Sequence, residues 1–163
     1  MTRAVIWRTL FRHMANIAKP LRGGATPATR ILGLPLPAAD PLELHSALRA
    51  GLPTKAISAL KTQTQLSDAD LAEALQISDR TFTRLKGTRA QRLAPDLSDR
   101  LYAVATLYAL AEQVLGDRDT ALEWMNAPQF GLAEGTPRSL LSTEPGRQQV
   151  RALLQRIEHG FLA

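Results

Sequence analysis

The sequence contains no cysteine. Disulfide bonds and zinc sites built from cysteine thiolates are therefore excluded, which suits a protein of the reducing cytoplasm. The three histidines, His13, His45 and His159, lie far apart and show no metal-ligand spacing. We therefore expect a cytoplasmic protein with no metal site and no cofactor.

Long apolar runs and aromatic residues are also scarce. The longest stretch without a charged residue is Leu101–Ala111, 11 residues, whereas a membrane-spanning helix needs roughly 18 or more. Arg8 and Arg12 interrupt the apolar residues near the N-terminus, so we expect no secretory signal and no membrane partner. Aromatic residues make up 5% of a chain that is 45% hydrophobic. This balance favours an all-α protein rich in alanine and leucine over a β-sandwich.

Acidic residues are missing from the first 39 positions. This segment holds Arg3, Arg8, Arg12, Lys19, Arg22 and Arg30, and the rest of the chain is close to neutral. Residues 1–19 can form a basic amphipathic helix, which would bind DNA phosphates or an anionic surface. The alternative, which we favour, is a poorly ordered extension without such a function. Residues 20–41 contain five prolines and the pair Gly23–Gly24, which indicates a linker. We therefore assign residues 1–40 to an extension and linker, and expect folded structure to begin near Pro41.

From Pro41 onward the start and stop signals predict helices and no strand. The expected helices cover residues 41–50, a segment opened by Pro53, 68–76, 79–86, 95–115 and 118–127, followed by two that Thr136 and Thr143 cap. The long helix 95–115 is apolar on nearly every side, so it is either central in a core or shared with a second subunit. We expect a helix-turn-helix domain over 41–115, joined by this helix to a small C-terminal domain over 116–163.

Residues 66–87 have the proportions of a helix-turn-helix. Leu71, Ala72 and Leu75 would face inward on the first helix, and Phe82 and Leu85 would pin the second helix to them. From Asp79 to Arg92 there are five basic residues and one acid, a local charge that suits the major groove of DNA. The candidate DNA-binding residues are Ser78, Arg80, Thr81, Thr83, Arg84, Lys86 and Arg89. The alternative is a structural helix pair with a basic surface.

This segment resembles the Xre-type helix-turn-helix, in which the pattern LxxxLAxxLGIsxxTxxRxK is common. Two residues depart from it. Gln76 stands where a turn glycine is usual, so the turn must be made in another way, and Asp79 would repel a phosphate at the start of the second helix. A homodimer would suit binding to an inverted repeat of operator DNA.

The C-terminal segment carries a second set of signals. Val150, Leu153, Leu154 and Ile157 form one apolar stripe, and Gly160 offers a left-handed stop. Phe161 and Leu162 then follow the helix, where they either fold back on their own core or anchor another protein. Upstream, Trp124, Met125 and Phe130 are expected in the core of this domain; a ligand pocket is the weaker alternative.

The string from Thr136 to Ala163 resembles the C-terminal toxin-binding domain of Xre/MbcA/ParS antitoxins. The matching residues are Thr136, Pro137, Leu140, Leu141, Thr143, Gly146, Arg156, Ile157, Glu158, His159 and Gly160. The resemblance implies an antitoxin that covers the active-site opening of a RES-domain toxin, an NAD⁺-consuming enzyme, with its C-terminal region. The toxin-facing residues would be Arg151, Arg156, Glu158, His159, Phe161 and Leu162, whereas Arg147 is expected only to face solvent.

Two other functions remain open at this point. The first is a transcriptional regulator without a toxin partner. The second, an enzyme or small-ligand sensor, is disfavoured because no Ser-His-acid arrangement and no glycine-rich phosphate loop is present. Glu158 and His159 are neighbours on a helix and point about 100° apart, so they cannot easily share a substrate.

Overall fold

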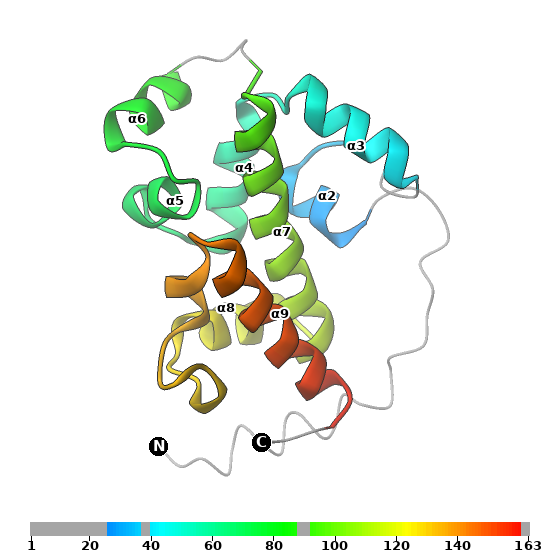
Figure 1. The fold of residues 1–163 in the computed structure, drawn as a ribbon, viewed down its shortest axis with the longest axis vertical. Helices are drawn as coiled ribbons and strands as arrows, with labels where there is room; N and C mark the ends of the chain where they lie inside the picture. The colour runs from blue at the N-terminus through cyan, green and yellow to red at the C-terminus, as the bar shows by residue number, and fades with distance from the viewer. Residues whose placement is uncertain (1–25, 37–39, 88–91, 161–163) are drawn as a thin grey trace.

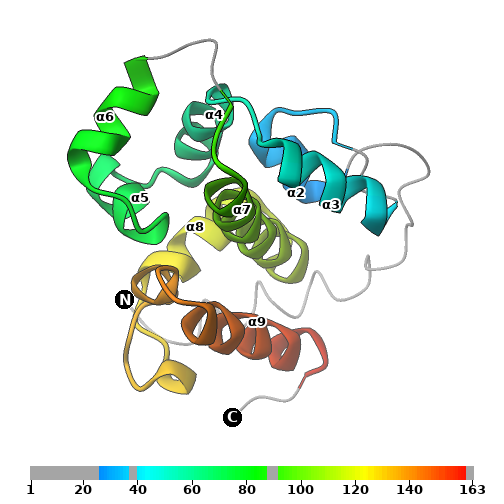
Figure 2. The same cartoon turned by 45° about the horizontal axis from the view of Figure 1, so that its top comes forward.

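One long helix organises the structure. The computed structural model describes residues 26–36, 40–87 and 92–160. Helix α7 spans Pro95–Leu115, begins with proline at its first position and ends at Gly116, whose φ is 99°. Ten of its residues are buried, on several faces of the helix. Figures 1 and 2 show it at the centre of the molecule, surrounded by α2, α3, α4, α8 and α9. The expected all-round apolar helix is therefore central in a core formed by its own chain.

The first helix of the described chain, α2, spans Pro27–Leu32 and lies against α7 and α4. Thr26 caps it, and Ile31 and Leu32 are almost completely buried. The prediction of a linker up to Pro41 is wrong for this segment. Pro27 occupies the first helical turn, where a missing N–H costs nothing. It therefore starts a helix where the density of prolines had indicated a flexible chain.

An ion pair joins this helix to the centre of the fold. The guanidinium of Arg30 contacts the carboxylate of Glu112 on α7. Arg30, a basic residue of the expected N-terminal extension, is thus part of the folded body. The expectations for residues 1–19 lie outside the described residues.

The next helices follow the predicted pattern. Helix α3 (Pro41–Ala50) is capped by Asp40 and buries no residue fully, while α4 (Lys55–Thr64) buries Ala56, Ile57 and Leu60. Helices α5 (Asp68–Ala74) and α6 (Asp79–Gly87) form an adjoining pair, to one side of α7 in Figure 1.

A close backbone approach fastens the start of α7 to the segment between α3 and α4. The Leu93 N–H donates to the Leu52 carbonyl at 2.8 Å, and the Leu52 N–H donates to the Ser98 hydroxyl at 2.9 Å. Gly51 has a φ of 86°, and a Cβ there would lie 2.2 Å from the Leu93 carbonyl oxygen. Within the described ranges the structure has no strand, only an isolated antiparallel bridge between Pro53 and Arg92. The predicted all-α fold is confirmed.

The C-terminal part contains two helices and two 3-10 turns. Helix α8 spans Arg118–Asn126 and is capped by Asp117, and α9 spans Glu144–Glu158 and is capped by Thr143. Between them lie η2 (Phe130–Leu132) and η3 (Pro137–Leu140). The helix start predicted at Thr136 is real, but it makes a 3-10 turn, since Pro145 and the Thr143 cap open a new helix only a few residues later.

The predicted core of this part is only partly correct. Met125 is fully buried and Trp124 is half-buried, but Phe130 is 78% exposed. The placement of Phe130 in the core is therefore wrong. None of the helices in the described part of the chain has the length and apolar character needed to cross a membrane.

The burial of α2 makes a testable prediction. Replacing Ile31 with alanine should lower the free energy of unfolding by about 2–5 kcal/mol, because it leaves a cavity between α2 and α7. Urea denaturation followed by circular dichroism measures this change. Leu42→Ala is the control, since Leu42 is 77% exposed and its truncation should change stability by less than about 0.5 kcal/mol. Equal stability of the two variants would mean that α2 does not belong to the core.

Candidate functional site

Helices α5 and α6 pack as a helix-turn-helix. Ser67 and Asp70 form a capping box, with the Asp70 N–H donating to the Ser67 hydroxyl at 3.1 Å and the Ser67 N–H donating back to the Asp70 carboxylate at 3.1 Å. The Ser67 side chain is the largest influence that lowers the pKa of Asp70. Leu71 and Ala72 of α5 and Phe82 of α6 are buried, as predicted. The packing of these apolar side chains holds α6 against α5.

The turn between these helices is made by a residue other than glycine. Gln76 adopts a left-handed conformation with φ 55°, which costs a residue with a Cβ roughly 1–2 kcal/mol. The Ile77 N–H donates to the Ala72 carbonyl at 3.0 Å and closes the end of α5. The Gln76 side-chain amide donates to the backbone carbonyl of Ser142, which lies just before α9. The glycine that is usual at this position has no side chain and could not make this bond. Gln76 therefore connects the turn to the C-terminal part.

The outer face of α6 carries the predicted DNA-binding residues. Arg80, Thr83 and Arg84 are exposed. Thr81 is half-buried; its N–H donates to the Ser78 hydroxyl at 3.3 Å, and the two hydroxyls lie 3.0 Å apart. Ser78 thus caps α6 as expected. Arg89 lies outside the described residues.

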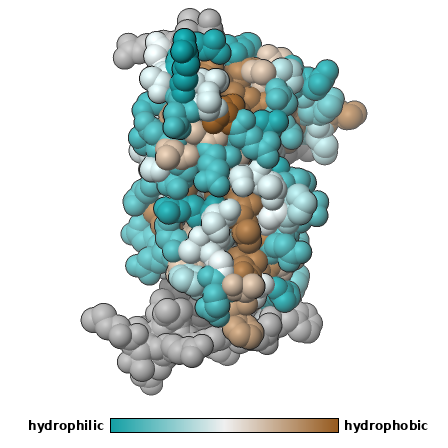
Figure 3. Space-filling view, turned by 60° about the vertical axis from the view of Figure 1, so that its left-hand side comes forward, coloured by the Kyte–Doolittle hydropathy of each residue, from teal (hydrophilic) through white to brown (hydrophobic). Residues whose placement is uncertain are grey.

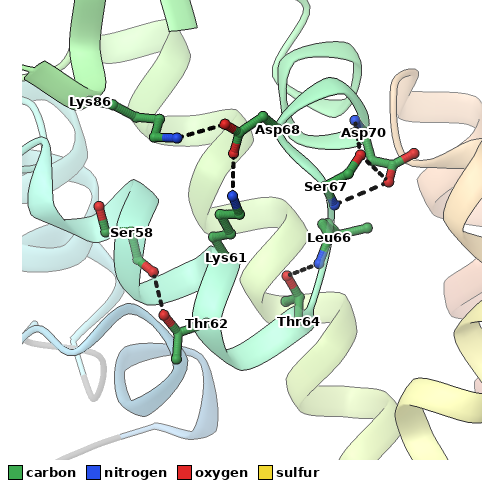
Figure 4. Close-up of polar contacts among 9 residues, drawn as sticks. All are labelled: Ser58, Lys61, Thr62, Thr64, Leu66, Ser67, Asp68, Asp70 and Lys86. Atoms are coloured by element: carbon green, nitrogen blue, oxygen red, sulfur yellow. Dashed lines mark hydrogen bonds and ion pairs between the residues drawn. The ribbon is translucent and has the colours of Figure 1, made fainter. Parts of the chain in front are cut away.

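Lys86 is tied to the body instead of projecting freely from α6. Its ammonium lies 2.6 Å from the Asp68 carboxylate, which Lys61 of α4 also contacts (Figure 4). Hydrogen bonds from Lys61 and then Lys86 hold the pKa of Asp68 below its usual value. The ammonium of Lys86 also lies 5.7 Å from the ring centre of Phe82. Lys86 therefore fastens the end of α6 to α5, and its charge is partly compensated.

A polar cluster joins the start of α5 to η3. The Arg138 guanidinium lies 3.6 Å from the Asp70 carboxylate. The hydroxyl of Tyr108 on α7 is buried and, among the described residues, has no hydrogen-bond partner. Burial raises the pKa of Tyr108 well above its usual value, so the phenol stays neutral. With the Gln76–Ser142 bond, α5 is therefore held at both of its ends by the segment 137–142.

The start of α9 is built around a glycine and an arginine. A Cβ on Gly146 would lie 2.2 Å from the Leu140 carbonyl oxygen, so only glycine permits this approach. Arg147 is 8% exposed. Its guanidinium donates to the Leu141 carbonyl at 2.8 Å and to the Glu144 carboxylate at 2.9 Å. The expectation that Arg147 only faces solvent is wrong, because the carbonyls ahead of the helix need a donor.

The far end of α9 presents the residues expected to face a partner. Arg156 and His159 are exposed, and Arg151 and Glu158 are half-buried. Gln113 of α7 donates to the Glu158 carboxylate at 3.4 Å. Gly160 has a φ of 71°, the predicted left-handed stop. Phe161 and Leu162 lie outside the described residues.

The two predicted surfaces lie on different parts of the molecule. Figure 1 shows α6 beside the first half of α7, whereas the C-terminal end of α9 lies at the opposite end of the fold. Within the described ranges no group of three histidine, aspartate or glutamate residues could hold a metal ion.

The comparisons with known proteins match both parts of this structure. Residues 43–105 match the antitoxin Xre-like helix-turn-helix domain, and residues 110–160 match the antitoxin Xre/MbcA/ParS C-terminal toxin-binding domain. A protein named Antitoxin Xre from Yersinia enterocolitica is 32% identical over 143 residues, which cover 85% of this chain and 96% of that protein. The chain belongs to the Xre antitoxin family.

Two other known proteins are similar to this chain. An Antitoxin Xre from Photorhabdus laumondii is 27% identical to this Xre-family chain over 144 residues, covering 85% of the chain and 97% of that protein. A chain in the crystal structure of the MbcT–MbcA toxin–antitoxin complex of M. tuberculosis is 25% identical, with a TM-score of 0.49. It covers 68% of this chain and 96% of its own length.

The sequence of the Xre-family chain predicted which residues are exposed on α6 and α9. It did not predict the polar contacts that join these elements to the rest of the fold. The exposed positions on α6 and α9 follow from helical periodicity. Gln76, Arg138 and Arg147 were missed as connecting residues, because their partners are backbone carbonyls or side chains on other elements. The one available signal was Gln76 itself, which replaces the usual glycine.

Arg147→Ala should destabilise the chain by about 1.5–3 kcal/mol, the range for hydrogen bonds to charged groups. Urea denaturation at pH 7 measures the loss, with Gln149→Ala as a control, since Gln149 is exposed.

The Arg147 guanidinium is also the main cause that lowers the pKa of Glu144 from 4.5. This contribution is complete above pH 4.5 and is lost as the pH falls through the lower pKa of the folded state. The difference in free energy of unfolding between wild type and Arg147→Ala should therefore become smaller in acid. A difference that grew in acid would contradict the pairing of Arg147 with Glu144.

Proposed function

We propose that this chain is the antitoxin of a type II toxin–antitoxin system, that it neutralises a RES-domain toxin which degrades NAD, and that it represses its own operon. The observation that carries the proposal is the match of residues 110–160 to the toxin-binding domain of the family. The relatives named Antitoxin Xre support it over nearly their whole length. In this function the chain is a binding protein of the cytoplasm, and it is not an enzyme.

The toxin would be bound through α9 and the segments packed on it. Exposed Arg156 and His159 and half-buried Arg151 and Glu158 supply charged and polar groups for an interface rim. Phe161 and Leu162 follow directly in the sequence. We propose that these two residues anchor the toxin through apolar contacts, which the charged and polar residues of the rim cannot supply.

Operator DNA would be bound through α6. A helix of this kind fits the major groove, where an arginine can donate two hydrogen bonds to guanine. Arg80, Arg84 and Thr83 lie on its exposed face. The exposed carboxylate of Asp79 lies in the first turn, so phosphate contacts there would be weakened, and the arginines would contribute most of the affinity.

A homodimer on an inverted repeat completes the proposal. Its subunit contact would not be α7, because five helices of the same chain cover that helix. The homodimer therefore rests on the two-fold symmetry that paired half-sites require.

A transcriptional regulator without a toxin is the second candidate, favoured by the exposed basic face of α6. We also retain the division into residues 41–115 and 116–163 as a proposal, with α2 added to the first unit.

Co-expression with the product of the neighbouring gene tests the toxin function. We expect the two proteins to purify as one stable complex, and the partner alone to stop growth while depleting cellular NAD. Growth should recover when this chain is co-expressed. A stable, DNA-binding chain that neither binds the neighbouring product nor restores growth would leave the regulator as the correct function.

Arg80→Ala tests the DNA-binding face. If Arg80 reads a base, affinity for the operator should fall by about 1–3 kcal/mol with relaxed specificity at one position; a uniform loss and a smaller salt dependence would identify a phosphate contact. Fluorescence anisotropy with the promoter fragment measures both. Arg49→Ala is the matched control, since Arg49 is also exposed but lies on α3. Equal losses from both variants would show that the chain binds DNA only by its general charge.

A further inference from the structure

Phe130 is unusual among the apolar residues of this chain. It is 78% exposed, and within the described ranges the only other exposed large hydrophobic side chain is Leu42. Leaving such a side chain in water forgoes the favourable free energy of burying it. Single exposed apolar residues are common, so exposure alone does not indicate a binding site. The surrounding backbone supplies the further evidence.

The loop that carries Phe130, residues 129–135, is closed by hydrogen bonds of its own backbone and of Gln129. The Gln129 N–H donates to the Gly135 carbonyl at 3.0 Å, which closes the loop. The Gln129 side-chain amide donates to the carbonyls of Trp124 and Ala127, both at 3.1 Å. These bonds tie the loop to the end of α8. The Phe130 ring is therefore presented on an ordered backbone, which lowers the entropy lost when a partner covers it.

The same loop contains local backbone strain. Ala133 and Glu134 have φ values of 52° and 62°, although neither is glycine. Strain of this kind persists only where surrounding contacts enforce it, and it is concentrated at functional sites. A loop that served only to connect α8 to η3 could relax or bury its phenylalanine. The chain instead maintains a strained turn with an aromatic side chain pointing outward.

The loop also packs against α9 beside a residue expected to face the toxin. A Cβ on Gly131 would lie 2.8 Å from Leu153 Cδ1 and 3.4 Å from the Arg156 guanidinium. Phe130 is thus the immediate chain neighbour of a glycine that lies against Leu153 and Arg156 of α9. Trp124 and Leu132 nearby are half-buried. Figure 3 shows apolar surface gathered in a narrow band over the lower half of the molecule, bordered by hydrophilic residues.

We propose that Phe130 is an aromatic anchor for the toxin, inserted into an apolar pocket of that protein while Arg156 forms part of the charged rim. This inference rests on the proposed antitoxin function and adds a contact outside the C-terminal tail. Aromatic side chains at the centre of an interface, surrounded by charged groups, carry a large share of binding energy. The loop lies within residues 110–160, the toxin-binding match, and at the end of the fold away from α6 (Figures 1 and 2). DNA would select basic residues there and not an isolated phenyl ring.

The test compares Phe130→Ala with Leu42→Ala, two truncations of similarly exposed apolar side chains. The probe is the RES-domain product of the neighbouring gene, and its Kd is measured by biolayer interferometry together with growth rescue. Phe130→Ala should weaken binding by about 30-fold or more, the effect of removing an aromatic hot spot. Leu42→Ala should change the Kd by less than about twofold. Phe130→Tyr should retain most of the affinity, since it keeps the ring.

Thermal unfolding and operator affinity should be the same for wild type and Phe130→Ala. Unchanged toxin binding by Phe130→Ala would overturn the anchor while leaving the antitoxin function intact. An equal loss from both truncations would overturn it as well. If Phe130→Ala instead abolishes self-association of the free chain, the ring contacts a second copy and not the toxin. Failure of the wild-type chain to bind the probe would reject the antitoxin function itself.

Discussion

The burial of α7 on nearly every side is the constraint on which the rest of the structure depends. Leu107, Tyr108 and Ala109 are consecutive residues, so they point about 100° apart around this helix, and all three are buried. A helix of this composition needs cover from several directions. The chain supplies it with α2 and α4 from the first part and with α8 and α9 from the second. Both parts therefore share one core, and neither can be removed without exposing a face of α7.

The segment before α9 connects the two surfaces that bind partners in the proposed function. It contacts α5 through the Arg138–Asp70 pair and the Gln76–Ser142 bond. It also contains the Leu141 carbonyl that Arg147 of α9 satisfies, and it approaches Gly146 too closely for any side chain. Gln76 and Arg147 each donate to a backbone carbonyl of this segment, whereas Arg138 and Asp70 pair through their side chains at 3.6 Å. These contacts fix the helix-turn-helix and the start of α9 relative to one another more firmly than apolar packing alone would.

The two surfaces differ in the chemistry they present. The outer face of α6 offers arginine and hydroxyl groups, which match phosphates and base edges. The end of α9 and the neighbouring 129–135 loop combine charged groups with an exposed phenyl ring, a mixture typical of the core and rim of protein interfaces. Lys86 marks the limit of the first surface, because its contact with Asp68 serves the packing of α6.

From Pro41 onward the sequence by itself determined the α-helices and most of their ends. Caps such as Ser67, Asp117 and Thr143 act on backbone groups two or three residues away, and the stripe of α9 follows from helical periodicity, so both can be recognised locally. Only the tertiary structure decided that α2 is core, that Gln76 adopts a positive φ, that Arg147 is buried and that Phe130 is not. Each of these outcomes depends on a partner distant in sequence or on the space left between packed helices. Burial is a property of the whole assembled core, and no local pattern of residues specifies it.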